Sequence, residues 1–317
     1  MFLHSVGSVG FFLYNCVMLN SFLTSRLASG CSPRTVTWYE QMISRFLSWM
    51  DQAGVSWPPG PEDVESFLSD ERRSGLSPST VAGRYRALSA WFSWLVARGH
   101  LPGSPMDHVA RPRVPRRIPR RVEVGQLAKL LETIPQDGTW VDARDRLILL
   151  LLFWTGLRLA ELAALEVRDL DSSRRLVRVR AGKGGRDRFV PYPVEIGPAL
   201  LSYLMARPPW SGPELFLSSD GGRAGGRVRG VLTDNGIRQM IRRRCQRAGV
   251  PYVNPHAFRH GLAMALLNSG EADLSLVARI LGHSSTSITQ RFYAQWTDDG
   301  MRSKYDRAAR AIAEADD

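Results

Sequence analysis

Residues 155–161, with the sequence Thr-Gly-Leu-Arg-Leu-Ala-Glu, mark a junction between two predicted helices. A strongly apolar helical pattern precedes this segment, Gly156 breaks that helix, and Arg158 stands near the start of the next one. Glu161 follows one turn later, where its carboxylate can hold the arginine. The segment therefore predicts a helical domain that presents an arginine at a helix junction.

Further motifs with polar side chains follow downstream. Residues 256–259 read His-Ala-Phe-Arg, and this i, i+3 spacing sets an imidazole and a guanidinium on one helical face. Leu281-Gly282-His283 comes next, and Tyr293 lies ten residues after that histidine. His260 is expected on a different helical face, as a packing or capping residue.

The same region is predicted to be mainly α-helical with a small β-sheet. Alternating segments at 176–180 and 188–190 indicate two strands around the turn Gly182-Lys183-Gly184-Gly185. Apolar spacing predicts helices at 124–134, 142–154, 160–165, 193–206, 233–248, 257–268 and 273–281.

These residue types fit the chemistry of a phosphodiester. Hydrolysis or transfer of a phosphodiester requires cations on the non-bridging oxygens, an in-line nucleophile and an acid for the leaving oxygen. The sequence has no acidic cluster typical of a two-metal site, so arginine and histidine would take the place of metal ions. We therefore expect neither a metal nor a cofactor.

The order of the motifs resembles the tyrosine recombinase (phage integrase) family, of the Xer-like or simple integrase type. The resemblance runs from Thr-Gly-Leu-Arg-x-x-Glu through the Gly-Lys-Gly hairpin, His-x-x-Arg-His and Leu-Gly-His to the tyrosine. It implies a two-domain architecture, with a helical core-binding (SAM-like) bundle and a mixed α/β catalytic domain that together form a C-shaped clamp around DNA.

The resemblance also implies roles for individual residues. Arg158 and Arg259 would clamp the scissile phosphate, with Glu161 as the supporting carboxylate. Lys183 would protonate the departing 5′ oxygen, although without the family context it is an ordinary turn lysine. His256 would be the general acid/base and His283 a hydrogen-bond donor to the phosphate, roles that suit imidazole near neutral pH.

The nucleophile is assigned to Tyr293, which would form a 3′-phosphotyrosyl link and free a 5′ hydroxyl. The usual family spacing falls one residue earlier, on Phe292, which cannot attack a phosphate. Tyr305 is the fallback nucleophile. It lies in a tail, residues 301–315, that either docks on a neighbouring protomer or closes its own domain.

The N-terminal part is predicted to be a bundle of four helices. Ser32-Pro33 and Ser77-Pro78 are typical helix starts, another helix begins at Pro61, and residues 19–27 supply the fourth. We assign residues 18–110 to this DNA-binding domain, with Arg34 and Arg84 as candidate DNA contacts. Residues 1–17 are apolar but lack the positive segment of a signal peptide; translation from Met18 is the preferred interpretation, with these residues either a non-native extension or a short apolar lead-in helix.

The charge, with 42 Lys and Arg against 30 Asp and Glu and a net charge of +12, favours a nucleic-acid partner no more than a role in solubility alone, so the location of the basic residues must decide. Segment 111–121 combines arginines with prolines and is predicted to be a linker before a catalytic domain at 122–317. It is either a strap along the DNA backbone, which we favour, or a solvated spacer. Its arginines are Arg111, Arg113, Arg116, Arg117, Arg120 and Arg121.

The resulting expectation is a cytoplasmic, nucleoid-associated enzyme that breaks and rejoins double-stranded DNA at specific sites through a Holliday junction. It would serve integration or excision of a mobile element, or dimer resolution. The expected assembly is a dimer on each site and a tetramer in the synapse, with an accessory DNA-bending protein as an optional partner and no membrane. The alternatives are an inactive DNA-binding accessory protein on the same fold and a type IB topoisomerase-like relaxing enzyme.

Overall fold

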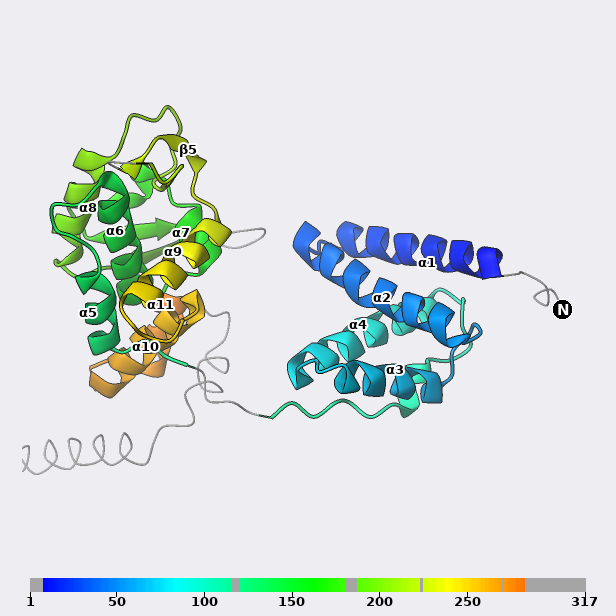
Figure 1. The fold of residues 1–317 in the computed structure, drawn as a ribbon. Helices are drawn as coiled ribbons and strands as arrows, with labels where there is room; N and C mark the ends of the chain where they lie inside the picture. Colours follow the sequence, from blue (N-terminus) through cyan, green and yellow to red (C-terminus); the bar gives the residue numbers. More distant parts are fainter. Residues whose placement is uncertain (1–7, 116–119, 181–186, 223–224, 270, 283–317) are drawn as a thin grey trace, which may run out of the picture. The chain divides into compact units, whose positions relative to one another are not determined.

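A computed structural model of the chain describes residues 8–115, 120–180, 187–222, 225–269 and 271–282. The chain divides into two compact units, Met1–Arg117 and Ile118–Asp317. Each unit is mainly helical and has its own hydrophobic core (Figure 1). The more exact domain limits predicted from the sequence, including the status of residues 1–17, stay predictions.

The N-terminal unit contains four long helices and a short 3-10 turn. They are α1 (Ser8–Ala28), α2 (Pro33–Ala53), α3 (Pro61–Arg73), α4 (Pro78–Ala97) and η1 (Pro105–His108). Ser32 and Ser77 each accept a hydrogen bond from a backbone N–H three residues later, at 3.2 Å, which confirms the predicted Ser-Pro starts of α2 and α4. The first helix begins well before the predicted residue 19.

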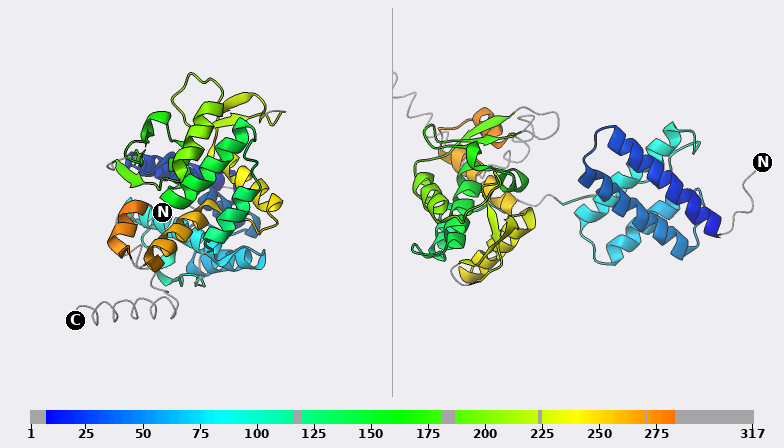
Figure 2. Two further views of the ribbon diagram at one scale, coloured as in Figure 1. Left: turned by 90° about the vertical axis from the view of Figure 1, so that its left-hand side faces the viewer. Right: turned by 90° about the horizontal axis from the view of Figure 1, so that it is seen from above.

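Aromatic side chains fill the core of this unit. The helix α2 packs against both α1 and α4, and α4 also packs against α3 (Figures 1 and 2). The fully buried residues Phe22, Phe46, Phe67 and Trp91 come one from each helix, so every helix contributes its apolar face to a single core.

The C-terminal unit is built from seven α-helices, one 3-10 turn and five short strands among its described residues. In chain order these are α5 (Val124–Glu132), α6 (Trp140–Thr155), α7 (Leu159–Ala163), η2 (Val167–Asp169), β1 (Leu170–Asp171), β2 (Leu176–Val179), β3 (Arg188–Pro191), α8 (Ile196–Ala206), β4 (Leu217–Ser219), β5 (Val228–Val231), α9 (Asp234–Arg247), α10 (Pro255–Ser269) and α11 (Leu274–Leu281).

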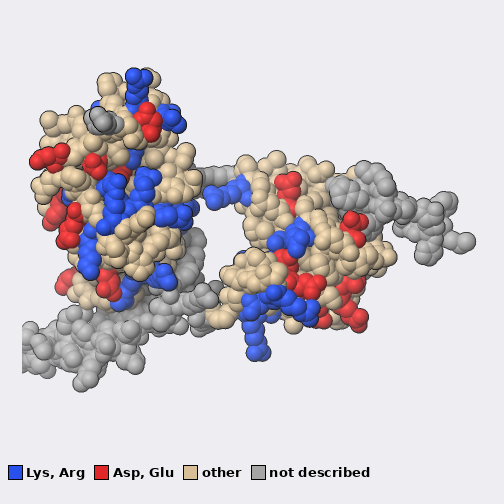
Figure 3. All heavy atoms as spheres, viewed as in Figure 1, with Lys and Arg blue, Asp and Glu red and all other residues tan. Residues whose placement is uncertain are grey.

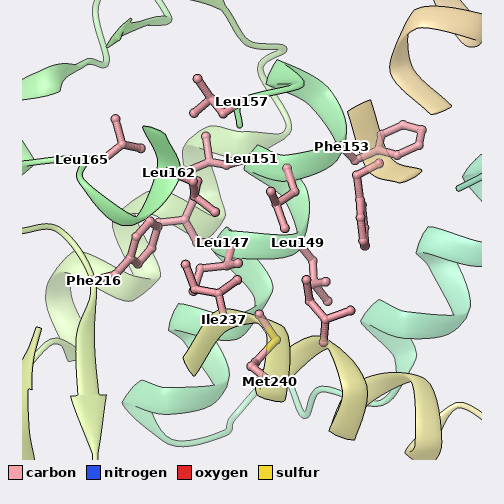
Figure 4. Packing of buried hydrophobic residues seen from close by; sticks show 14 of the residues in the cluster. Leu147, Leu149, Leu151, Phe153, Leu157, Leu162, Leu165, Phe216, Ile237 and Met240 are labelled. Atoms are coloured by element: carbon pink, nitrogen blue, oxygen red, sulfur yellow. The ribbon is translucent and has the colours of Figure 1, made fainter. Parts of the chain in front are cut away.

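The helix α6 lies at the centre of this unit. It is buried nearly all round, as expected of its continuous apolar sequence, and it packs against both α8 and α10. Figure 4 shows leucines of α6 such as Leu147 and Leu151 among side chains from other elements, including Phe216, Ile237 and Met240. The C-terminal end of α6, which carries Gly156, is thereby held in place by the core.

Two small antiparallel sheets flank the helices. The predicted hairpin is confirmed as β2 and β3, with Val177 opposite Val190, and β1 extends it to the order β1-β2-β3. The strands β4 and β5 form a second sheet that the sequence did not predict. Because β1 and β4 are only two and three residues long, they carry too little alternation to be recognised.

A buried ionic network joins α6 to α9. Asp145 accepts hydrogen bonds from Arg144 and Arg244 at 2.7 and 2.8 Å, and all three residues are at most 3% exposed. Arg244 also pairs with Asp142 at 2.7 Å, and Arg144 donates to the carbonyl of Leu217 at the same distance. Each buried charge is therefore compensated, as burial requires.

A helix that crosses a lipid bilayer must be both long and strongly apolar. None of the described helices meets both requirements.

Candidate active site

The candidate site is formed where the C-terminal ends of α6 and α11 meet the N-terminal ends of α7 and α10. Arg259 of α10 is 3% exposed, and its guanidinium donates to the carbonyls of Gly156, at 2.7 Å, and Leu281. These carbonyls lie at the ends of α6 and α11, where the helix dipole is negative and favours a cation. Arg259 therefore ties two helix ends together.

Arg158 lies beside the same helix end. Its Nη1 donates to Glu161 Oε1 at 2.8 Å and its Nη2 to the carbonyl of Gly282 at 3.0 Å. The side chain is 46% exposed, so a ligand can reach its guanidinium from solvent. The structure therefore brings Arg158 and Arg259 together at the end of α11, although they are far apart in the sequence.

Glu161 holds Arg158 by its backbone as well as its side chain. The backbone N–H of Arg158 donates to Glu161 Oε2 at 2.8 Å, which is the carboxylate half of a capping box at the start of α7, since an arginine side chain has no acceptor to complete it. Arg188 of β3 donates to both carboxylate oxygens, at 2.9 and 2.8 Å. Burial acts to raise the pKa of Glu161, but the hydrogen bonds from Arg188 and Arg158 outweigh it and lower the pKa to about 2.

His256 is in the first turn of α10, next to both arginines. The residue keeps an exposed surface, but partial burial and then the positive charges of Arg259 and Arg158 lower its pKa from the usual value of 6.5. The imidazole is therefore neutral near pH 7, the form that accepts a proton.

The prediction that His260 faces another side of the helix was wrong. Its ring lies edge-on to that of His256, with centroids 4.6 Å apart, because residues four apart are neighbours on a helix. His260 is 7% exposed, which agrees with its expected role in packing.

Three predicted catalytic residues, Lys183, His283 and Tyr293, lie outside the described residues, as do Phe292, Tyr305 and the tail 301–315. Their roles stay predictions. The described part of the site nevertheless ends at Gly282, so His283 follows directly in the sequence from the carbonyl that Arg158 contacts.

The predicted DNA contacts fall into different environments. Arg34 is exposed, whereas Arg84 is only 13% exposed and pairs with the buried Glu71 of the same unit. In the linker, Arg111, Arg113, Arg120 and Arg121 are exposed, while Arg116 and Arg117 lie outside the described residues. The pairing of Arg84 with Glu71 gives this arginine a structural role that the sequence did not indicate.

Two features of the site were not predicted. The first is Arg188, whose link to Glu161 spans 27 residues and so left no local signal in the sequence. The second is the basic face of α9, with Arg242, Arg243 and Arg247 exposed. Figure 3 shows basic side chains gathered on this face of the C-terminal unit. Because α9 is amphipathic, its basic face could have been predicted from the sequence.

Comparisons with known proteins agree with this geometry. The model of the phage integrase family matches residues 120–299, and that of the phage integrase N-terminal SAM-like domain matches residues 18–99. The tyrosine recombinase XerC of Chromohalobacter salexigens is 38% identical over 229 residues, which are 70% of this chain and 72% of that protein.

Solved structures share the fold. A crystal structure of XerA recombinase is 26% identical, with a TM-score of 0.51 over 92% of this chain and 98% of that one. The Tn1549 transposon integrase in complex with transposon right end DNA is 22% identical, with a TM-score of 0.69 over 92% of this chain and 99% of that one. The chain belongs to the phage integrase family and is a tyrosine recombinase of the Xer-like type.

Proposed function

We propose that this chain is a site-specific DNA recombinase that cuts and rejoins strands through a covalent bond between Tyr293 and a 3′ phosphate. The observation that carries the proposal is the convergence of Arg158, Arg259 and His256 at the end of α11. Two guanidinium groups held by protein carbonyls are preorganised to stabilise the charge that grows on a phosphate under attack. Such positioning is the main catalytic device available for phosphoryl transfer.

In the proposed step, the Tyr293 oxygen attacks phosphorus and loses its proton, for which His256 is the candidate acceptor. The bond from phosphorus to the 5′ oxygen breaks, and that oxygen takes a proton from Lys183. His283 donates a hydrogen bond to the phosphate. The phosphotyrosyl ester keeps the bond energy, so a 5′ hydroxyl of a partner strand can reverse the step.

The proposed substrate is double-stranded DNA. Its phosphates would contact the exposed arginines of segment 111–121 and of α9, because the guanidinium fork matches phosphate oxygens in pairs. Two rounds of exchange through a Holliday junction would need a dimer on each site and a tetramer in the synapse. The biological role would be movement of a mobile element or resolution of dimers, in the cytoplasm, with an accessory DNA-bending protein as an optional partner.

The test is covalent trapping. A random duplex library is enriched for binding to the full chain, and the selected duplexes are nicked so that the cleaved strand is lost and religation fails. We expect a protein–DNA adduct that survives denaturation and maps to Tyr293. Tyr293→Phe should abolish it, and the matched control Tyr305→Phe should retain it.

Each alternative predicts a different result. An adduct that maps to Tyr305 would identify this tyrosine of the tail as the nucleophile. No adduct on any enriched duplex would favour the inactive accessory protein. Relaxation of supercoiled plasmids that lack the enriched sequence, at the rate of plasmids that contain it, would favour the topoisomerase-like enzyme.

A further inference from the structure

Arg188 makes a set of contacts that tie β3 to the candidate site. Its two terminal nitrogens donate to the two carboxylate oxygens of Glu161, at 2.9 and 2.8 Å. Its Nε donates to the carbonyl of Ile280 at a longer 3.4 Å. The side chains of Arg188 and Glu161 are 21% and 16% exposed, so this two-pronged ion pair is largely shielded from solvent.

The end of α11 receives three arginines on three successive carbonyls. Arg188 donates to Ile280, Arg259 to Leu281 and Arg158 to Gly282. The last carbonyls of a helix have no partner within it, and the negative end of the helix dipole attracts cations. Arg188 thus shares its anchor with both arginines that we assign to the phosphate.

Arg188 also shares a carboxylate with Arg158. Glu161 lies between the two guanidinium groups and accepts from both. With one negative charge between two positive ones, the group keeps a net positive charge that a phosphate can use. Without Arg188, Glu161 would be free to turn fully onto Arg158, neutralising its charge and rotating its guanidinium.

We propose that Arg188 is a positioning residue for DNA cleavage, which holds Glu161 and the end of α11 so that the guanidinium of Arg158 stays directed at the phosphate. This inference rests on the proposed function. Arg188 acts through Glu161 and needs no contact with DNA. It therefore influences the rate of the chemical step and leaves the affinity for DNA unchanged.

The experiment compares Arg188→Ala with the wild-type full chain on enriched nicked duplexes, measuring single-turnover cleavage at saturating protein and, separately, the Kd for DNA. A displaced guanidinium should slow cleavage by about 100-fold, since a misplacement of roughly 1 Å has this effect, while the Kd stays unchanged. Arg178→Ala is the matched control, because Arg178 lies on the adjacent strand β2 and pairs with Asp187 at 2.7 Å. This control should cleave at the wild-type rate.

Two more variants separate positioning from a structural role. Arg188→Lys keeps the charge but lacks the planar fork, so its cleavage rate should fall between those of wild type and Arg188→Ala. Glu161→Gln should slow cleavage by itself, and adding Arg188→Ala to it should have little further effect, because both changes break one unit.

The outcomes are distinguishable from a failure of the proposed function. If the wild-type chain forms no adduct, the proposed function fails and this inference with it. If the wild type cleaves and Arg188→Ala cleaves equally well, only the inference is overturned. Full recovery in Arg188→Lys, or additive losses in the Arg188→Ala/Glu161→Gln chain, would overturn it too. Thermal unfolding of each variant identifies any loss that reflects unfolding.

Discussion

Gly282→Ala offers a sharp test of how the site is assembled, because Gly249 provides a matched control. Both glycines end helices of the same unit with a φ of +64°, a left-handed conformation that costs other residues about 1–2 kcal/mol. A Cβ at Gly282 would lie 2.8 Å from the guanidinium carbon of Arg188, whereas one at Gly249 would meet nothing within 4 Å. The two substitutions thus share backbone strain and differ in this one contact.

The clash falls on the movable end of a side chain, so its cost should appear in activity more than in stability. We expect both Ala variants to lose about 1 kcal/mol of unfolding free energy, the strain of a left-handed residue. In Gly282→Ala the guanidinium must also move by more than half an ångström to reach an ordinary contact of 3.4 Å. Cleavage should then slow by about 10-fold to 100-fold.

The assays are urea denaturation and single-turnover cleavage of the enriched nicked duplex. Gly249→Ala should lose the same stability and cleave at the wild-type rate. Equal cleavage by the two variants would refute the claim that an absent side chain at Gly282 is needed to seat Arg188. A much larger loss of stability in Gly282→Ala would instead place the effect in the backbone.

Other predictions concern charge. Replacing 111–121 with a neutral spacer should reduce the salt dependence of DNA binding, because fewer counterions are released, and an unchanged slope would contradict the strap. Asp145→Ala leaves the buried Arg144 without a carboxylate and Arg244 with Asp142 alone, and should cost about 3–5 kcal/mol in urea denaturation, against about 0.5 kcal/mol for the exposed pair removed by Asp70→Ala. Since the pKa of His256 is lower in the folded chain than in the unfolded one, its contribution to stability falls as pH drops below 6.5. Arg158→Gln should raise this pKa in an NMR titration, and an unchanged value would show that the two groups do not interact.

Much of the helical fold was predictable because its signals are local. Ser32 and Ser77 each cap a helix through a hydrogen bond to a residue three positions away, and the apolar sequence of α6 predicts a buried helix wherever it is placed. The start of α8 was less accurate, because the helix begins at Ile196 and the predicted start was Pro193. Turn residues before a helix carry apolar side chains too, which blurs the boundary.

The pairing of residues within one motif was also predictable, because the partners are close in the sequence. Arg158, the N-cap of α7, lies three residues before Glu161, and His256 lies three residues before Arg259 on one face of α10, so each pair is close in any such helix. The sequence therefore predicted which residues pair within each motif, while their catalytic roles, which the family resemblance implies, stay predictions. The order of the motifs then indicated the family, which the comparisons show.

Only the tertiary structure decided how these pairs meet. Arg158 reaches Gly282 across 124 residues and Arg259 reaches Gly156 across 103, because packing of α6, α10 and α11 brings their ends together. The role of Arg188 likewise depends on β3 lying beside α11. Contacts of this kind depend on how the core packs. They therefore produce no periodicity or residue spacing from which they could be predicted.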